Sequence, residues 1–292
     1  MILKINNLTK VYPNGVKALD GLNIEIKSGM FGLLGPNGAG KSSFMRTLAT
    51  LQTPDSGSIF FDDLDVLKNP MELRKRLGYL PQEFGVYPKM SAWDLLDYLA
   101  VLKGISVSRE RSELINQVLE ITNLFDVRKK NVDGFSGGMK QRFGIAQLLL
   151  NNPKLIIVDE PTAGLDPAER NRFLNVLRDI ASENIIIFST HIVDDIKDLC
   201  NDMAIMNKGR ILAKIHPLEA EKEIEGKIWT SSVSPDDLEK TEKTFCVLSS
   251  RYNPDNSISV RVFSEDQPAG FMVSTPNLED VYFLTLQTGN VN

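Results

Sequence analysis

The stretch Met30-Phe-Gly-Leu-Leu-Gly35-Pro-Asn-Gly-Ala-Gly40-Lys41-Ser42 decides the fold. Residues 30–34 form a short apolar run, which is typical of a buried strand in a mostly parallel sheet. Residues 35–42 match the phosphate-binding-loop pattern, in which two glycines are followed by Lys and Ser. Glycine lets backbone N–H groups approach an anion closely, and a helix that begins after the loop points its N-terminal dipole at that anion. The stretch therefore predicts a strand, a nucleotide-binding loop and a helix in succession.

Two residues of this loop have specific expected tasks. Lys41 is expected to reach the terminal phosphates, and the hydroxyl of Ser42 is expected to bind magnesium. The predicted nucleotide-binding loop consists of Gly35, Pro36, Asn37, Gly38, Ala39, Gly40, Lys41, Ser42 and Ser43.

Two further apolar runs end in reactive side chains. Residues 155–158 lead into Asp159 and Glu160, and residues 185–188 lead into Ser189-Thr190-His191. Ligands of open α/β sheets bind beyond the carboxyl ends of the strands. We therefore expect the glycine loop, the two carboxylates and His191 to meet at one edge of a sheet.

The carboxylate pair indicates hydrolysis in addition to binding. Burial of two carboxylates without a counter-ion is costly. Proteins with this type of loop supply magnesium, held by the acid at the end of such a strand, here Asp159. Glu160 is then free to act as a general base toward the attacking water. A solvated turn would explain either carboxylate alone, but the pair together with the glycine loop favours a catalytic site.

Composition narrows the class of protein. The 292 residues suffice for one large domain plus a smaller one, or for one α/β domain with extensions. The formal net charge of −5 argues against a nucleic-acid partner. The two cysteines, Cys200 and Cys246, fit reduced thiols in a cytosolic protein better than a disulfide framework or a metal site. Two histidines are too few for a multi-histidine metal centre.

Membrane signals are missing from the sequence. The N-terminus lacks the layout of a signal peptide, and no run approaches the roughly 18 consecutive apolar residues that span a bilayer. If the protein works in transport, we expect the membrane pathway to belong to another chain.

The pattern along the chain predicts a domain of residues 1–216 and an accessory domain of residues 217–292. Between about residues 85 and 150 the pattern predicts helices. Ser91-Ala-Trp-Asp94 is a capping box that begins the first, residues 108–124 predict a second, and a third follows Ser136. This insertion lies between two of the site strands, so we expect a subdomain. The tail contains an alternating segment, residues 257–263, and a helical one, residues 277–286, which predict a small α+β appendix.

One further motif links the chain to a known family. Ser136-Gly-Gly-Met-Lys-Gln-Arg142 lies shortly before the acidic strand. With the glycine loop and the carboxylates, it resembles the signature loop of ABC-type ATPases, and the resemblance covers residues 1 to about 216. It implies a P-loop NTPase of the α/β class, with a mostly parallel sheet core, an antiparallel β part, a helical signature subdomain and a small C-terminal α+β appendix. Residues 276–283 are similar to the tail of ATPases of ABC-2-type systems, which export drugs, lipids, polysaccharides, ions or peptides.

The resemblance assigns three more residues to the nucleotide site. Tyr12 would stack on adenine, although it would also suit a packing role. Gln82 would contact magnesium and water and sense the γ-phosphate, with an ordinary turn as the alternative. His191 would touch the γ-phosphate as a switch histidine. The implied catalytic set is Glu160, His191 and Gln82, and the implied metal set is Ser42, Gln82 and Asp159.

Other residues would act between two subunits. In this family the signature loop of one subunit closes over nucleotide held by the phosphate loop of another, so Ser136, Gly137 and Gly138 would contact a partner's ATP. Phe135 and Met139 stand where Leu and Gln are commonest in the family.

Asp166 would communicate between the subunits. The sequence Asp-Pro-Ala-Glu at residues 166–169 is also a capping box, so Asp166 would additionally suit a helix cap.

The resemblance also implies partners. A chain with one copy of each motif needs a second copy, or a paralogue, to enclose two ATP molecules with Mg²⁺. The helical insertion, with residues 83–88, would contact a membrane permease. Exposed Phe84 and Tyr87 would suit that interface, and local core is their alternative. The implied activity is ATP hydrolysis coupled to export, on the cytoplasmic face of the cell membrane as a peripheral subunit.

Two rival functions share some of these features. An ABC ATPase with a non-transport role, such as an assembly factor, would carry the same motifs. A P-loop kinase would need the phosphate loop but not the signature loop, and its turnover would depend on an acceptor other than water.

Overall fold

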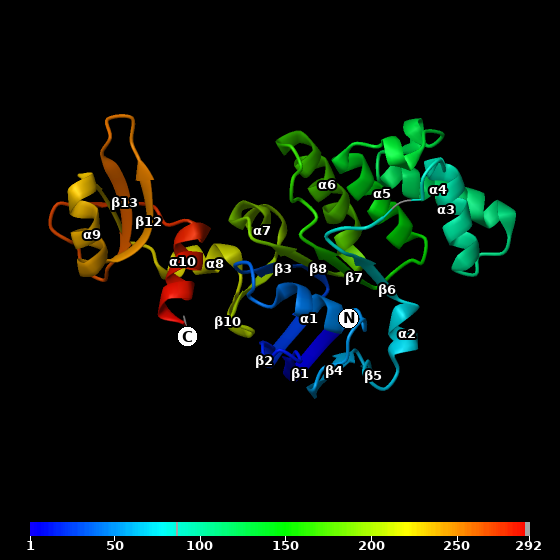
Figure 1. The fold of residues 1–292 in the computed structure, drawn as a ribbon, viewed down its shortest axis with the longest axis horizontal. Helices are drawn as coiled ribbons and strands as arrows, with labels where there is room; N and C mark the ends of the chain where they lie inside the picture. The colour runs from blue at the N-terminus through cyan, green and yellow to red at the C-terminus, as the bar shows by residue number, and fades with distance from the viewer. Residues whose placement is uncertain (86, 290–292) are drawn as a thin grey trace.

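The computed structural model describes residues 1–85 and 87–289. Val86, in the segment predicted to contact a permease, and residues 290–292 of the predicted accessory domain lie outside the described residues. Figure 1 shows a large body and, to one side, a smaller sheet with its own helix, coloured orange; α8 (Pro217–Glu223) lies between the two, beside α10 (Leu278–Thr288).

A six-stranded sheet carries the predicted site strands at its centre. Its strand order is β10-β9-β3-β8-β7-β6, and every neighbouring pair is parallel except β10 and β9. The three predicted site strands are β3, β8 and β7, side by side, which confirms the mostly parallel core. The strands are β3 (Gly29–Leu34), β6 (Leu77–Leu80), β7 (Leu155–Asp159), β8 (Ile185–Thr190), β9 (Asp202–Asn207) and β10 (Arg210–Ile215).

Both faces of this sheet are covered. Ile186 and Phe188 pack in a core with α6 (Pro167–Ile180) and α7 (Val193–Leu199). Their neighbour Ile187 packs in a second core with α1 (Lys41–Leu48) on the opposite face. Burial on both faces explains why these strands are continuous apolar runs.

A four-stranded antiparallel sheet completes the second core, as the family resemblance implies. Its strand order is β2-β1-β4-β5. Leu3 and Ile5 of β1 pack in the same core as Phe31 of β3 and Phe44 of α1, so α1 is anchored by both sheets. The elements are β1 (Ile2–Val11), β2 (Lys17–Lys27), β4 (Ser56–Phe61), β5 (Leu64–Asp65) and the short helix α2 (Pro70–Arg74).

The helical insertion has the three predicted helices around a core of its own. They are α3 (Ala92–Leu102), α4 (Ser108–Ile121) and α5 (Gly137–Leu149), with 3-10 turns at Phe125–Val127 and Val132–Gly134. Ser91 caps α3, since its hydroxyl accepts a hydrogen bond from the Asp94 N–H at 3.1 Å. The predicted end of the second helix is too late, because Asn123, directly after the C-cap Thr122, has a left-handed φ of +54° that a helix cannot continue through.

The C-terminal part forms a small antiparallel sheet with two helices. The strand order is β12-β13-β11-β14. Its elements are β11 (Ile228–Val233), α9 (Pro235–Thr244), β12 (Cys246–Tyr252), β13 (Ile258–Phe263), β14 (Met272–Val273) and α10 (Leu278–Thr288). In Figure 1 the red helix α10 lies between this sheet and the large body.

α10 joins the C-terminal sheet to the main sheet. Val281 packs in the core that also contains Ile196 and Leu199 of α7. On the sheet side, Arg261 of β13 donates two hydrogen bonds to the buried carboxylate of Asp280. Among the described residues, no helix is long and apolar enough to cross a membrane.

Candidate functional site

A cavity of about 640 Å³ lies at the predicted loop. Residues 37–43 line it without a gap, together with Tyr12, Gln82 and Glu160. These groups come from four separate regions of the sequence, so the fold brings most of the predicted nucleotide site to one place. Gly35 and Pro36 are not among the lining residues, but their carbonyl oxygens accept hydrogen bonds from Lys41.

Two glycines of the loop are required by close backbone approach. A Cβ atom on Gly35 would lie 2.3 Å from the Met206 carbonyl oxygen, and one on Gly40 would lie 2.4 Å from the Ala18 carbonyl oxygen. Gly40 also has φ +105°, in the left-handed region that favours glycine, and directly precedes α1. The loop is thus fixed by its neighbours on β9 and β2.

Lys41 is buried at the base of the cavity. Its Nζ donates a hydrogen bond to the Gly35 carbonyl at 2.7 Å and lies 3.3 Å from Glu160 Oε1. His191 Nδ1 lies 3.3 Å from the other carboxylate oxygen, Oε2, of Glu160. The carboxylate predicted as the base therefore lies between the predicted phosphate-binding lysine and the predicted switch histidine.

Ser189 organises the two carboxylates, a role that sequence reasoning missed. Its Oγ accepts a hydrogen bond from the Glu160 N–H at 3.0 Å and donates one to Asp159 Oδ1 at 2.7 Å. Glu160 itself has φ +44°, which is uncommon for a residue with a side chain. The available signal was the polar residue at the end of an otherwise apolar strand.

Asp159 lies deeper than the cavity surface. It is buried, and within the described residues no Lys, Arg or His nitrogen forms an ion pair with it. Burial, and to a lesser degree the charge of Asp159, raise the pKa of the Tyr79 hydroxyl. A buried carboxylate of this kind calls for a counter-ion.

The predicted magnesium ligands fit the preference of that ion for oxygen. Ser42 and Gln82 line the cavity, whereas Asp159 is buried next in sequence to the lining residue Glu160. In the part of the chain that the structure describes, no three or more His, Cys, Asp or Glu side chains are arranged so that they could hold a metal ion by themselves. Magnesium is commonly held by one or two carboxylates plus substrate phosphates, so this sparse set suits it.

Tyr12 is fixed at the wall of the cavity. Its hydroxyl lies 3.0 Å from Ser43 Oγ and donates a hydrogen bond to Gln52 Oε1 at 3.1 Å. Sequence reasoning missed two cations that also line the cavity, Lys17 and Lys208. Neither lies in a recognisable motif, so no local signal marked them.

The signature residues lie elsewhere. Ser136, Gly137 and Gly138 do not line the cavity. Ser136 caps α5, with its Oγ accepting from the Met139 N–H at 3.2 Å, and both Ser136 and Gly137 are exposed. Gly138 is buried against Glu169 of α6. The fold thus places the signature loop outside the cavity, with its first two residues open to solvent.

Asp166 has the capping role that the sequence allowed. Its Oδ1 accepts a hydrogen bond from the Glu169 N–H at 2.9 Å at the start of α6. The residue opens the helix that packs against α5.

Of the two aromatic residues predicted to be exposed, Tyr87 is exposed and Phe84 is not. Phe84 is half-buried, and its ring packs against Gly144 of α5, where a Cβ would lie 2.9 Å from the ring. Tyr87 is 56% exposed and contacts the ring of Tyr98 edge-on, with ring centroids 6.0 Å apart. Tyr87 is therefore exposed as predicted, whereas exposure is wrong for Phe84, which takes the alternative of local core.

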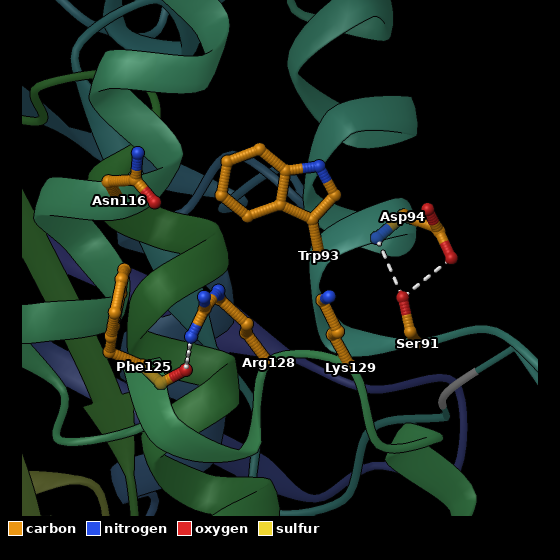
Figure 2. A pocket seen from close by; sticks show the side chains of 7 residues that line it. All are labelled: Ser91, Trp93, Asp94, Asn116, Phe125, Arg128 and Lys129. Atoms are coloured by element: carbon orange, nitrogen blue, oxygen red, sulfur yellow. Dashed lines mark hydrogen bonds between the residues drawn. The ribbon is translucent and has the colours of Figure 1, made fainter.

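A second cavity, of about 610 Å³, lies within the helical insertion (Figure 2). None of the predicted site residues lines it. Its main cation, Arg128, lies over the Phe125 ring at 3.9 Å and donates to the Phe125 carbonyl at 2.7 Å, as Figure 2 shows. Arg128 is therefore engaged locally, and this second cavity contains none of the predicted site residues.

Comparisons with known proteins agree with this geometry. The sequence profile described as "ABC transporter" matches residues 19–163. The chain is 40% identical over 217 residues to a bacitracin transport ATP-binding protein of Bacillus licheniformis, covering 73% of this chain and 69% of that protein. It is 34% identical over 254 residues to a Nod factor export ATP-binding protein of Cupriavidus metallidurans, covering 86% and 82%. A solved structure of a component of an ABC transporter complex from Clostridium perfringens superposes with a TM-score of 0.70 at 30% identity, covering 76% of this chain and 90% of that one.

Proposed function

The chain belongs to the ABC transporter family of ATP-binding proteins, and we propose that it hydrolyses ATP in a dimer that powers a separate membrane permease for export. The observation that carries the proposal is the contact of Glu160 with both Lys41 and His191 at the cavity. The signature residues outside that cavity support the dimer. We assign residues 1–216 to the nucleotide-binding domain and residues 217–292 to the accessory domain.

Lys41 is the group that ATP would recruit. Its ammonium donates a hydrogen bond to the Gly35 carbonyl and pairs with Glu160. A triphosphate in the loop offers it stronger anionic partners, so Lys41 turns toward the phosphates and stabilises the charge on the transferred phosphoryl group. Glu160 then loses its cation and is free to accept a proton from water.

Glu160 and His191 would handle the attacking water. Glu160 acts as general base, and the exposed His191 ring beside it contacts the γ-phosphate side of the site. Magnesium, when bound with ATP, would be held by Ser42, Gln82 and Asp159, and would neutralise phosphate charge. Tyr12 would stack on the adenine base.

The site needs a second subunit to be complete. Ser136 and Gly137 are exposed on α5 and would contact the ATP of a partner chain, either an identical copy or a paralogue. Asp166, at the start of the adjacent helix α6, would carry the communication between subunits. Both assignments rest on the family and on the placement of the loop outside its own cavity.

The permease would contact the helical insertion. Tyr87 and Tyr98 form an exposed aromatic pair there, and aromatic residues are enriched at protein interfaces. Binding at that surface would place the chain peripherally on the cytoplasmic face of the membrane. The direction of transport is proposed from relatives whose names state bacitracin transport and Nod factor export.

Glu160→Gln tests the proposal. The amide cannot accept the proton of water, so the ATPase rate should fall by about 10²–10⁴-fold. ATP binding should persist, and an ATP-bound dimer should accumulate on size-exclusion chromatography. The matched control is Glu221→Gln, which removes a carboxylate paired with Lys197 away from the cavity and should leave both readouts unchanged. Hydrolysis by Glu160→Gln at the parent rate would show that the base is wrongly assigned, and a monomer with ATP bound would contradict the shared site.

A further inference from the structure

Asp195, in the first turn of α7, is a fully buried carboxylate outside the nucleotide cavity. It is 0% exposed. Its Oδ2 accepts hydrogen bonds from the hydroxyls of Thr162 at 2.8 Å and Thr190 at 3.1 Å. Its Oδ1 accepts one from Arg170 Nε at 2.5 Å. A carboxylate buried with a cation and two hydroxyl donors is fully satisfied, so its position is well determined.

The two hydroxyl partners belong to the chain segments that carry the catalytic groups. Thr162 lies two residues after Glu160, in the turn that leaves β7. Thr190 directly precedes His191, and its Oγ1 also accepts a hydrogen bond from the Ile192 N–H at 2.9 Å. The residue before His191, Thr190, is therefore held by Asp195, and the residue after it, Ile192, is held by Thr190.

The third partner connects the same carboxylate to the signature side of the molecule. Arg170 lies on α6, the helix that Asp166 caps and that packs against α5. The side chain of Asp195 thus contacts the turn after Glu160, the segment of His191 and helix α6.

The C-terminal helix holds α7 in place from the other side. Ile196 and Leu199 of α7 pack in one core with Leu278 and Val281 of α10. Since Asp195 is one residue before Ile196, its backbone is set by that packing.

We propose that Asp195 is a positioning residue for ATP hydrolysis, which holds the segments of Glu160 and His191 in one relative geometry. The inference rests on the proposed function. Asp195 does not line the cavity, so its effect on Glu160 and His191 passes through its hydrogen bonds with Thr162 and Thr190. Displacement of a catalytic group by about an ångström lowers the rate of hydrolysis without a matching effect on ATP binding.

Asp195→Asn is the direct test, because the amide keeps the size of the side chain but presents only one accepting atom. We expect kcat to fall roughly ten- to a hundredfold, with the KM for ATP and the affinity for a fluorescent ATP analogue unchanged. The matched control is Asp194→Asn, which removes an exposed carboxylate from the same helical turn and should leave kcat unchanged. Parent kcat in Asp195→Asn, or equal losses in the two variants, would overturn the proposal.

The His191→Ala background separates positioning from a general structural effect. Because the proposal has Asp195 hold the segment of His191 as well as that of Glu160, Asp195→Asn should lower kcat by a smaller factor in that background than in the parent, and an equal factor in both would overturn the proposal. Thr162 supplies a second test should Asp195→Asn fold poorly. Thr162→Ser keeps the donated hydrogen bond and should keep kcat, whereas Thr162→Val should lower it, and equal rates would overturn the proposal. Failure of the proposed function would appear separately, as equal rates in the parent and Glu160→Gln.

Discussion

Replacement of Gly138 by alanine should force α5 and α6 apart. A Cβ on Gly138 would lie 2.3 Å from Glu169 Oε2 and 2.7 Å from Glu169 Cβ. The carboxylate end of Glu169 can rotate away, but its Cβ is fixed to the backbone of α6. That atom must retreat by about 0.7 Å to reach the 3.4 Å at which ordinary contact begins. The helices therefore have to separate, or the backbone has to bend.

The displaced Glu169 also holds Arg142. The Arg142 guanidinium is 5% exposed and lies 3.1 Å from Glu169 Oε2. Forcing a methyl group into a packed contact typically costs about 1–3 kcal/mol, and loosening this buried ion pair adds to the loss. For a domain of this size, each kcal/mol lowers the melting temperature by about 2–4 °C, so Gly138→Ala should melt roughly 2–12 °C below the parent.

The neighbouring glycine gives a matched control. A Cβ on Gly137 would lie 3.7 Å from Leu165, which is an ordinary contact, so Gly137→Ala should fit and keep the parent melting temperature or raise it slightly. Scanning fluorimetry of the three proteins measures the difference, and binding of a fluorescent ATP analogue should be the same in all, since neither glycine lines the cavity. Equal melting temperatures for Gly137→Ala and Gly138→Ala would refute the packing argument.

Two further predictions concern the cysteines and the C-terminal sheet. Burial raises the pKa of both cysteine thiols, and Cys200 is buried whereas Cys246 is partly exposed. Iodoacetamide should therefore label Cys246 slowly in the folded protein and Cys200 only after unfolding, which peptide mass spectrometry would measure. Equal labelling rates for the two cysteines would contradict this. Arg261→Met leaves the Asp280 carboxylate buried without its cation, so urea unfolding should show a loss of about 3–5 kcal/mol. Arg251→Met, whose carboxylate partner is exposed, should change stability little, and similar losses in both variants would count against the buried pair.

Local signals in the sequence were sufficient for much of the fold and for half of the site. Apolar runs identified β3, β7 and β8 because these strands are buried on both faces. Ser91 and Asp166 were recognisable as helix caps because a cap binds a backbone N–H only three residues away. The phosphate loop was recognisable because its sequence pattern lies within eight consecutive residues, Gly35 to Ser42.

Contacts between distant segments were not accessible from these patterns. Asp194 and Asp195 look alike as acids at the start of a helix, and only the fold shows that Asp195 meets Thr162 and Thr190 inside the molecule. Phe84 was expected at the surface because nothing near it in the sequence indicates that Gly144 leaves space for its ring. Likewise, no pattern within residues 277–286 reveals that this helix packs against α7.

The most direct test of the shared nucleotide site is a mixing experiment. Lys41→Ala removes the phosphate-binding ammonium but leaves the signature loop intact. Ser136→Asp keeps a good helix cap and leaves the phosphate loop intact, while it places a negative charge where a partner's ATP would lie. Each variant alone should hydrolyse ATP at the background rate. In an equimolar mixture, mixed dimers contain one complete site, so ATPase activity should reappear and peak at equal amounts. Activity of the mixture no greater than the sum of the two separate variants would contradict the account.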